Sequence, residues 1–387
     1  MHKPDTGFWR DFTLDIPIFC SAVLLLGVGL LMVTSASMVI SEQQFGTPFH
    51  FLVRQLIHVG IGVVLSLFAL RIDLNQWQRS GFIWLGFSIA LLVLVLVPGI
   101  GRHVNGSVRW IYLGPISLQV SELAKFSVIL YLAGYLVRRA EEVQRSVTGF
   151  LKPMVVLGLM AFLLLMEPDF GATAVIMATA LAMMFLAGVR LWQYAVMFSG
   201  VAMALAVLAI TSPYRVARLT TFMHPWANQF DSGYQLTQSL IAFGRGGIFG
   251  VGLGDSIQKL FYLPEAHTDF LFAVLAEELG LIGELAIIAL FCIMIGRAMW
   301  VGRKAYDIGH HFAAYLSYGL GLWMAFQAMV NIGVNAGILP TKGLTLPLMS
   351  YGGSSIIINC VVIAILLRIS SDIVPLKQSR MRTEYAQ

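Results

Sequence analysis

The chain has 387 residues, of which 58% are hydrophobic and 12% charged, and its mean hydropathy is +0.80. A soluble globular protein carries about twice that share of charged residues, so these values exclude an ordinary soluble enzyme. The net charge of +5 does not call for nucleic acid, because its distribution is explained by membrane topology. We expect a polytopic helical membrane protein that contacts membrane lipid and no nucleic acid.

Apolar runs long enough to cross a bilayer as helices recur along the chain. They predict ten spans, near residues 16–40, 50–70, 78–98, 119–137, 153–167, 170–188, 191–211, 268–296, 312–337 and 354–371. Most of the 25 basic residues fall in connections on the same side as the two chain ends. Because cytoplasmic connections are enriched in lysine and arginine, both termini are expected in the cytoplasm.

The architecture expected from these spans is an all-α bundle of about ten transmembrane helices, forming one domain over residues 1–387. Outside the bundle lie a cytoplasmic leader, one long extracytoplasmic loop and a cytoplasmic tail, at residues 1–15, 212–267 and 372–387. The loop is too short to fold around a core of its own, so we expect it to cover the bundle as a lid or wall.

Within this loop, SGYQLTQSLIAF at 232–243 is amphipathic and predicts a helix at the membrane interface. GRGGIFGVGLG at 244–254 could cradle a phosphate through backbone N–H groups. It lacks the strand and the GK[ST] of nucleotide-binding loops, so sharp turns are the favoured interpretation. Arg215 and Arg218 are candidates for contacts with an anion or for anchors at the rim.

The stretch FYLPEAHTDFLFAVLAEELGLIG, residues 261–283, passes from a polar loop into an apolar helix. It carries Glu265, His267 and Asp269 at the predicted mouth. A helix that begins at Asp269 places Glu277 about 12 Å deeper on the same small, acidic stripe. Lipid cannot solvate such a stripe, so it should face other helices. Asp269 is therefore expected at the water-facing rim of a crevice.

Charged residues also mark the connection between the third and fourth spans. Arg102 and Arg109 lie in the segment 99–118, which suits either a binding loop or an interfacial loop with an anchoring tryptophan. Glu122 and Lys125 follow with i, i+3 spacing on one helical face. That spacing suits a structural ion pair as well as direct contact with a substrate.

Two further outer segments carry unusual residues. EPDFG at 167–171 places two carboxylates close enough for a cation, although a polar turn needs no ligand. In the segment 331–357, prolines and glycines interrupt any continuous helix around Lys342. Irregular backbone at membrane depth is tolerated where it is buried or lines a wet cavity, which makes Lys342 a candidate binding residue.

One acid among several cations suits an amphipathic anion that carries phosphate on its head and a lipid tail between helices. The cations would stabilise a diphosphate leaving group. The acid would act as general base on an attacking hydroxyl, a contribution of about 10²–10⁴ in rate. Serine hydrolysis by a triad is a poor fit, because no nucleophilic serine is evident beside His267 and Asp269.

Three segments resemble the signature sequences of the SEDS family, the shape, elongation, division and sporulation proteins. They are YQLTQSLIAFGRGGIFGVGLG, FYLPEAHTDFLFAVLAEELGLIG and LPLMSYGGSS, and the similarity extends over essentially the whole chain. NAGILPTKGLTLPLMSYGGSS and RAMWVGRKAYDIGHHF are most similar to the cell-division member. The family commonly has proline where this chain has Val120, which leaves the start of the fourth helix open.

The resemblance implies a ten-helix peptidoglycan glycosyltransferase in the bacterial inner membrane at the division septum. Such enzymes polymerise lipid II outside the membrane, with a class B penicillin-binding transpeptidase and other divisome membrane proteins. The essential aspartate of the family corresponds to Asp269, the lysine of the last outer loop to Lys342, and the basic third-to-fourth connection to Arg102 and Arg109. Further substrate-binding candidates are Arg215, Arg218, Glu122, Lys125, Glu265 and His267. A divalent cation, Mg²⁺ or Mn²⁺, is compatible with this chemistry, and no metal ligands are assigned.

The hypothesis is that Asp269 deprotonates the acceptor sugar 4-hydroxyl, which displaces undecaprenyl diphosphate with inversion. A lipid II flippase and a non-catalytic scaffold that activates the transpeptidase are the alternatives. A transporter is expected to contain paired broken helices, whereas the sequence indicates a single broken segment, at 339–353.

Overall fold

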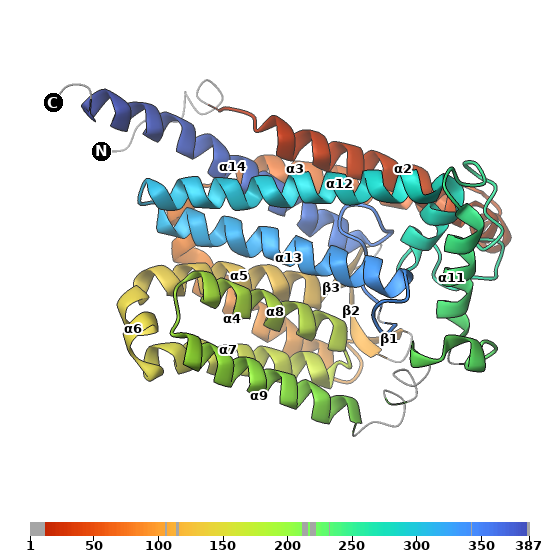
Figure 1. Cartoon of the computed structure of the whole chain (residues 1–387), viewed down its shortest axis with the longest axis horizontal. Coiled ribbons are helices and arrows are strands. Elements are labelled where there is room, and N and C mark those ends of the chain that lie inside the picture. Colours follow the sequence, from red (N-terminus) through yellow and green to blue (C-terminus); the bar gives the residue numbers. More distant parts are fainter. Residues whose placement is uncertain are drawn as a thin grey trace.

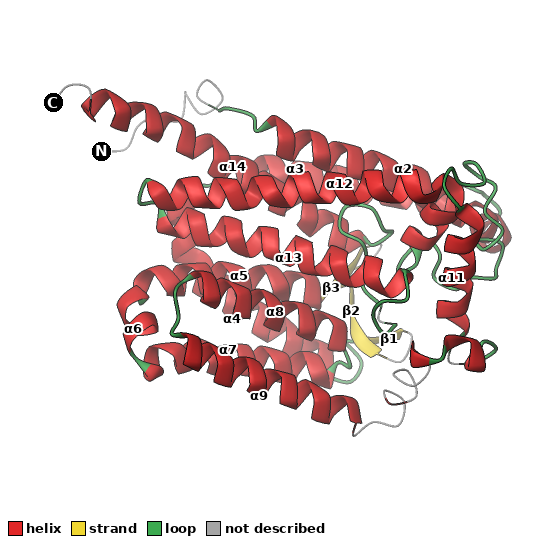
Figure 2. Ribbon diagram, viewed as in Figure 1, coloured by secondary structure: helices red, strands yellow, loops and turns green. Residues whose placement is uncertain are grey.

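The computed structural model describes residues 12–104, 107–113, 116–210, 216, 222–231, 233–341 and 343–384. Within these ranges, long helices run side by side, and a small sheet and a crosswise helix lie toward one end (Figure 1, Figure 2). The long helices are α2 (Ile16–Phe45), α3 (His50–Arg71), α4 (Leu74–Leu96), α5 (Val120–Arg138), α7 (Val147–Met166), α8 (Phe170–Leu186), α9 (Leu191–Ile210), α12 (Leu271–Asp307), α13 (His311–Asn335) and α14 (Gly353–Glu384). They follow the ten predicted spans, and the prediction of an all-α polytopic fold is confirmed.

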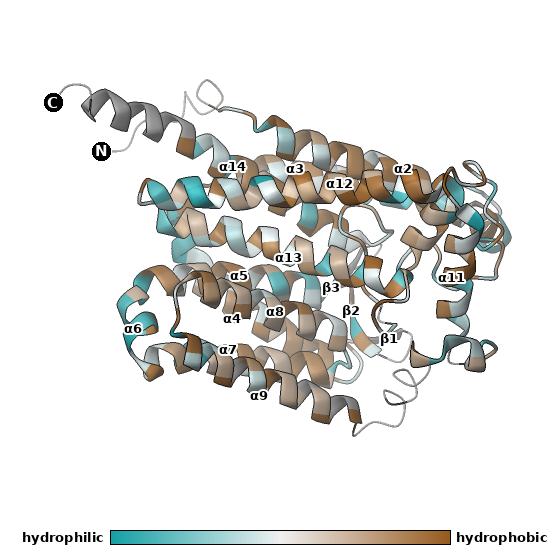
Figure 3. Cartoon of the chain, viewed as in Figure 1, coloured by the Kyte–Doolittle hydropathy of each residue, from teal (hydrophilic) through white to brown (hydrophobic). Residues whose placement is uncertain are grey.

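Seven described helices are long and apolar enough to cross a membrane: α2, α3, α4, α5, α7, α12 and the part of α14 from Gly353 to Ile373. α8 and the Leu191–Ala204 part of α9 are apolar but shorter. α13 has 25 residues and carries Gln327, Asn331 and Asn335 on its buried side. Hydrophobic residues dominate the long helices (Figure 3), as a lipid environment requires.

The two ends of the bundle differ in character. α2 begins and α14 ends at the same end, where the short helix α6 (Ala140–Arg145) also lies (left in Figure 1). η1 (Pro225–Asn228) and α11 (Tyr234–Gly246) lie at the opposite end, and α11 runs across the long helices. The amphipathic helix predicted at 232–243 is therefore present. α5 is central, since 89% of its most apolar stretch is buried by other elements.

The connection between α4 and α5 folds into an antiparallel sheet of three strands. These are β1 (Arg102–Val104), β2 (Ser107–Leu113) and β3 (Ile116–Gln119), in the order β1-β2-β3. Trp110 pairs with Arg102 on one side and with Gln119 on the other. The sequence predicted a loop here, and the structure adds a small sheet beside the helical bundle. α5 begins at Val120, directly after β3, so the helix starts without the proline usual in the family.

α12 is broken at Gly280, which has φ 64° and ψ −168°. The segment 247–252 lies against the break and replaces the lost helical hydrogen bonds. Val251 N donates to Glu277 O at 3.0 Å, and Leu281 N donates to Gly247 O at 3.0 Å. A Cβ on Gly280 would lie 2.3 Å from the nitrogen of Gly250, so the close approach requires glycine at this position.

This break corrects two expectations. The helix begins at Leu271 rather than near residue 268, and α12 is broken in addition to the single broken segment that the sequence indicated at 339–353. The bonds from 247–252 also confirm that the glycine-rich stretch forms sharp turns, with positive φ at Gly247, Gly250 and Gly252.

Two buried carboxylates hold residues 245–260 to the broken helix. Glu277 accepts from Arg245 Nη1 at 2.7 Å and from the backbone N of Ile257 at 3.1 Å. Glu278 accepts from Lys259 Nζ at 2.8 Å and from the hydroxyl of Ser35 in α2 at 2.6 Å. Because each buried charge has a cationic partner, these acids stabilise the position of residues 245–260 over the bundle.

Candidate active site

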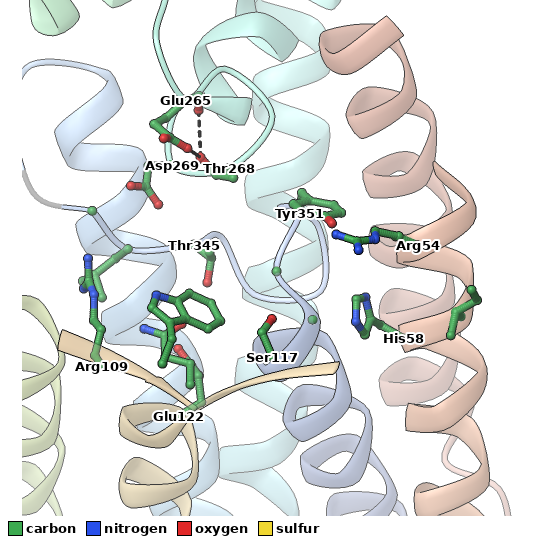
Figure 4. Close-up of a pocket in the computed structure, with 17 residues that line it drawn as sticks. Arg54, His58, Arg109, Ser117, Glu122, Glu265, Thr268, Asp269, Thr345 and Tyr351 are labelled. Carbon is green, nitrogen blue, oxygen red and sulfur yellow. Dashed lines mark hydrogen bonds between the residues drawn. The ribbon is translucent and has the colours of Figure 1, made fainter. Parts of the chain in front are cut away.

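A cavity of about 470 Å³ lies between α3, the sheet, the start of α5 and the segments that precede α12 and α14. The polar side chains on its wall come from segments far apart in the sequence (Figure 4). They are Arg54, His58, Arg109, Ser117, Gln119, Glu122, Glu265, Thr268, Asp269, Thr345 and Tyr351. Both charged and neutral hydrogen-bonding groups therefore converge on one space inside a hydrophobic bundle.

Asp269 lies on this wall, two residues before α12 begins. Its backbone carbonyl accepts from the side-chain amides of Asn331 at 2.8 Å and Asn335 at 3.0 Å, which tie it to α13. A Cβ added at Gly343 would lie 2.7 Å from Asp269 Oδ2, so the broken segment approaches the carboxylate closely. The backbone of Asp269 is thus held by α13, and its carboxylate lies against the segment 339–353.

The surroundings of Asp269 raise the pKa of its carboxyl group to about 7. Burial is the main cause; the charges of Glu265 and Asp169 raise it further, and that of Arg109 lowers it. A carboxyl group with a pKa near neutrality can accept a proton from a hydroxyl and later release it. This is the property expected of a general base.

Arg109 projects from β2 into the cavity, where its Nη1 lies 3.5 Å from Oδ1 of Asp169. The same carboxylate accepts from the backbone N of Ala172 at 3.1 Å and so caps the start of α8. Asp169 therefore fixes the guanidinium beside the cavity. The adjacent Glu167 is buried, and burial together with the charge of Asp169 raises its pKa to about 8, against an opposing effect of Arg109.

Glu265 and His267 differ in orientation. Glu265 lines the cavity, has a left-handed backbone with φ 56°, and accepts from the Thr268 hydroxyl at 2.7 Å. The ring of His267 packs against Phe51 at 4.7 Å and Tyr351 at 5.6 Å between centroids. Burial lowers the pKa of His267, while Glu265 opposes this shift. The structure thus places Glu265 beside Asp269 and places the His267 ring in an aromatic cluster.

Glu122 and Lys125 form a buried ion pair, with Lys125 Nζ 2.7 Å from Glu122 Oε1. Lys125 also donates to Gln327 Oε1 at 2.7 Å, and its Nζ lies 5.2 Å from the centroid of the Trp323 ring. Glu122 reaches the cavity wall, whereas Lys125 joins α5 to α13 behind it. The ion pair joins α5 to α13, and its acid also borders the cavity, so a role of the two residues in substrate binding stays a prediction.

Four of the predicted binding residues have no described side chain. Arg102 has a described backbone in β1, but Arg215, Arg218 and Lys342 lie outside the described residues. Gly343, which follows Lys342, lines the cavity.

Arg54, His58 and Tyr351 line the cavity, and none of them was among the predicted site residues. Arg54 and His58 are spaced i, i+4 in the apolar helix α3, and polar groups at that spacing share a helical face. Ionisable residues inside an apolar helix are a signal of function that could have identified them. Among the described residues, no cluster of three or more histidine, cysteine, aspartate or glutamate side chains could hold a metal ion.

The fold and the cavity define a polytopic membrane protein with an internal polar site. This site holds an acid and a cation near one end of the bundle. The model of the FtsW, RodA and SpoVE family of cell cycle proteins matches residues 16–373. The chain therefore belongs to this family, and the SEDS resemblance is confirmed.

Its relatives include two proteins named probable peptidoglycan glycosyltransferase FtsW. The one from Coxiella burnetii is 58% identical over 374 residues, covering 96% of this chain and 99% of the relative. The one from Legionella pneumophila is 58% identical over 348 residues, covering 90% and 88%.

Solved structures share the fold. A chain of a peptidoglycan synthase complex that coordinates polymerization and crosslinking is 26% identical, with a TM-score of 0.76 over 93% of this chain and 98% of that one. The rod shape determining protein RodA of Thermus thermophilus is also 26% identical, with a TM-score of 0.69 over 93% and 97%.

Proposed function

We propose that this peptidoglycan glycosyltransferase of cell division polymerises lipid II by an inverting displacement in the cavity, with Asp269 as the general base. The observation that carries the proposal is the placement of Asp269, whose pKa of about 7 suits proton transfer, on the same wall as Arg109. An acid alone would suit many reactions. An acid beside a cation, in a cavity within a lipid-facing bundle, suits an amphipathic phosphate substrate.

In the proposed step, the 4-hydroxyl oxygen of the acceptor sugar attacks the anomeric carbon of the donor. The hydroxyl proton passes to Asp269, the new C–O bond forms, and the bond between the anomeric carbon and the diphosphate oxygen breaks. The electron pair leaves with undecaprenyl diphosphate, and attack from the opposite face inverts the donor carbon. The carboxyl group then returns its proton to water, which restores the base.

Arg109 would stabilise the charge that develops on the departing diphosphate, because a guanidinium binds phosphate oxygens in a fixed bidentate geometry. Arg102, Lys342, Arg215 and Arg218 remain proposed contributors to this cationic environment. Asp169 would keep Arg109 in place through the 3.5 Å contact.

We place the cavity on the extracytoplasmic side, with both termini in the cytoplasm, in the bacterial inner membrane at the division septum. The start of α2 and the last turn of α14 support this placement, because both lie at the end of the bundle opposite α11. A class B penicillin-binding transpeptidase is the proposed partner, together with other divisome membrane proteins. The related complex that coordinates polymerization with crosslinking supports such a pairing.

Lipid transport is not favoured by any specific feature of the cavity. The sequence argued against a flippase because it indicated a single broken segment. The break in α12 at Gly280 removes that argument. However, the break is filled by backbone bonds from 247–252, and Gly280 does not line the cavity wall. The preference for an enzyme therefore depends on the acid and the cation in the cavity.

The decisive experiment measures glycan polymer formed from purified lipid II in the presence of the transpeptidase. Asp269→Asn should reduce the rate by about 10²-fold or more while retaining assembly with the partner, because only the proton acceptor is lost. Asp231→Asn, an exposed aspartate in the outer segment, is the matched control and should polymerise normally. Polymer at the wild-type rate from Asp269→Asn would remove the proposed base. Wild-type complementation of cell division by that variant would favour the scaffold.

A further inference from the structure

The cavity has a second cationic region, on the side of α3, that the proposed base does not use. Arg54 and His58 project from α3 across the cavity from Arg109 and Asp269 (Figure 4). The charged groups that set the pKa of Asp269 are Glu265, Arg109 and Asp169, so Arg109 is the arginine that acts on the base. The two arginines therefore serve different parts of one space.

The backbone at the α3 side adds a further positive element. α14 begins at Gly353, and Tyr351, Gly352 and Gly353 line the cavity, so the first turn of a long helix borders it. The first N–H groups of a helix have no partner within it and carry part of the positive end of the helix dipole. Two glycines in succession leave this backbone accessible to an anion.

His58 also belongs to this side of the cavity. Its side chain is 8% exposed and it lines the cavity, so a buried polar ring lies beside the start of α14. A Cβ added at Gly353 would lie 2.7 Å from His58 Nε2, so the ring lies directly against the start of α14. An anion bound by Arg54 at the start of α14 would therefore lie against the Nε2 side of this ring.

The α3 side is also tied to the turn before α14 by a hydrogen bond. Gln55 Nε2 donates to Ser350 O at 3.1 Å, which joins α3 to the turn before α14. Arg54 faces the Tyr351 hydroxyl, and burial raises the pKa of that hydroxyl while Arg54 opposes the shift. Ile57, an apolar residue of α3, lines the cavity and is 55% exposed. A polyprenyl tail could therefore leave the cavity along α3 while its phosphates remain inside.

Resting on the proposed function, we infer that Arg54, His58 and the start of α14 form a separate diphosphate subsite, which holds the acceptor lipid. The chemistry of polymerisation requires two lipid diphosphates at once. In the donor, the diphosphate is attached to the reacting carbon and must lie beside the base, where Arg109 is. In the acceptor, the diphosphate is separated from the reacting 4-hydroxyl by the whole disaccharide, so it must be bound away from the base.

Binding of undecaprenyl diphosphate to the full chain in lipid nanodiscs tests this inference without turnover. Wild type and Asp269→Asn should each bind two molecules. Arg54→Gln should retain one site and weaken the other about tenfold or more, because a charge-assisted contact is lost. His58→Gln should weaken the same site to a smaller extent. Arg303→Gln, which removes an exposed arginine from the far end of α12, should behave as wild type.

Competition identifies the ligand chemistry. Inorganic diphosphate should displace probe from the Arg54 site, and phosphatidylglycerol should not. In polymerisation, Arg54→Gln should raise the KM for lipid II about tenfold with a smaller change in kcat, whereas Asp269→Asn should reduce kcat.

Several results would overturn the second subsite. They are one bound molecule in wild type, two equal sites in Arg54→Gln, loss of both sites in Arg54→Gln, or displacement by phosphatidylglycerol alone. The proposed function fails separately, if Asp269→Asn binds two molecules and still polymerises.

Discussion

The ionisation of Asp269 should limit polymerisation on the acid side of neutrality. The pKa of this carboxyl group is raised to about 7, chiefly by burial and next by the charge of Glu265, with Arg109 opposing. A general base acts only when deprotonated, so about half the molecules are active at pH 7 and about one-tenth at pH 6. The rate should therefore fall about tenfold per pH unit below the pKa.

Glu265→Gln provides the test of this reasoning. The substitution removes a negative charge that disfavours ionisation of Asp269, while the amide oxygen can keep the 2.7 Å bond from the Thr268 hydroxyl. Loss of one neighbouring like charge should lower the pKa of Asp269 by about one unit. At pH 6 the ionised fraction would rise from about one-tenth to about one-half, a gain of about fivefold relative to the plateau of each enzyme.

The assay is the initial rate of glycan synthesis with the transpeptidase present, measured from about pH 5 to about pH 9 and scaled to each plateau. Glu141→Gln is the control, because Glu141 is exposed near the opposite end of the bundle. The acid limb of Glu265→Gln should move to lower pH, and that of Glu141→Gln should not move. An unchanged limb, or one displaced to higher pH, would refute the assignment of Asp269 as the titrating base.

Two further predictions concern stability. Lys125→Met should destabilise the fold by about 3–5 kcal/mol, because it leaves Glu122 buried without its cation. Thermal unfolding in detergent should show a lower Tm. The double variant Glu122→Gln, Lys125→Met should recover most of the lost Tm. An unchanged Tm would mean that the ion pair does not stabilise α5. Gly246→Ala should also lower Tm, since its Cβ would lie 1.9 Å from Ala276 O, whereas Gly244→Ala has nothing within 4 Å and should preserve or raise Tm by helix propensity. Equal effects of the two substitutions would contradict the close contact of α11 with α12.

Much of the site could be anticipated from single residues that are unusual in their setting. Asp269 was identifiable because a carboxyl group at the start of an apolar helix is costly unless it is functional. Arg109 was singled out as a charged residue of the connection before the fourth span and Glu122 by its spacing from Lys125, and both line the cavity. Arg54 is one of the basic residues outside the inner connections, but neither it nor His58 was chosen as a site residue, because nothing local shows which face of a helix borders a cavity.

The orientation of neighbouring side chains was beyond local reasoning. Glu265 and His267 are two residues apart in one loop, yet only Glu265 lines the cavity. Glu265 has a positive φ, and the His267 ring packs against Phe51 of α3. The second contact depends on a helix distant in the sequence.

The membrane fold and its long helices could be determined from the sequence alone, because transfer of apolar residues into lipid depends mainly on segment length and composition. The family could be determined from the signature segments. The break at Gly280 and the pKa of Asp269 were decided only by tertiary structure. The break persists because residues 247–252 supply its hydrogen bonds, and the pKa depends on charges from three separate segments. Hydrophobicity acts locally along the chain, whereas hydrogen-bond satisfaction and electrostatic coupling depend on which distant segments the fold brings into contact.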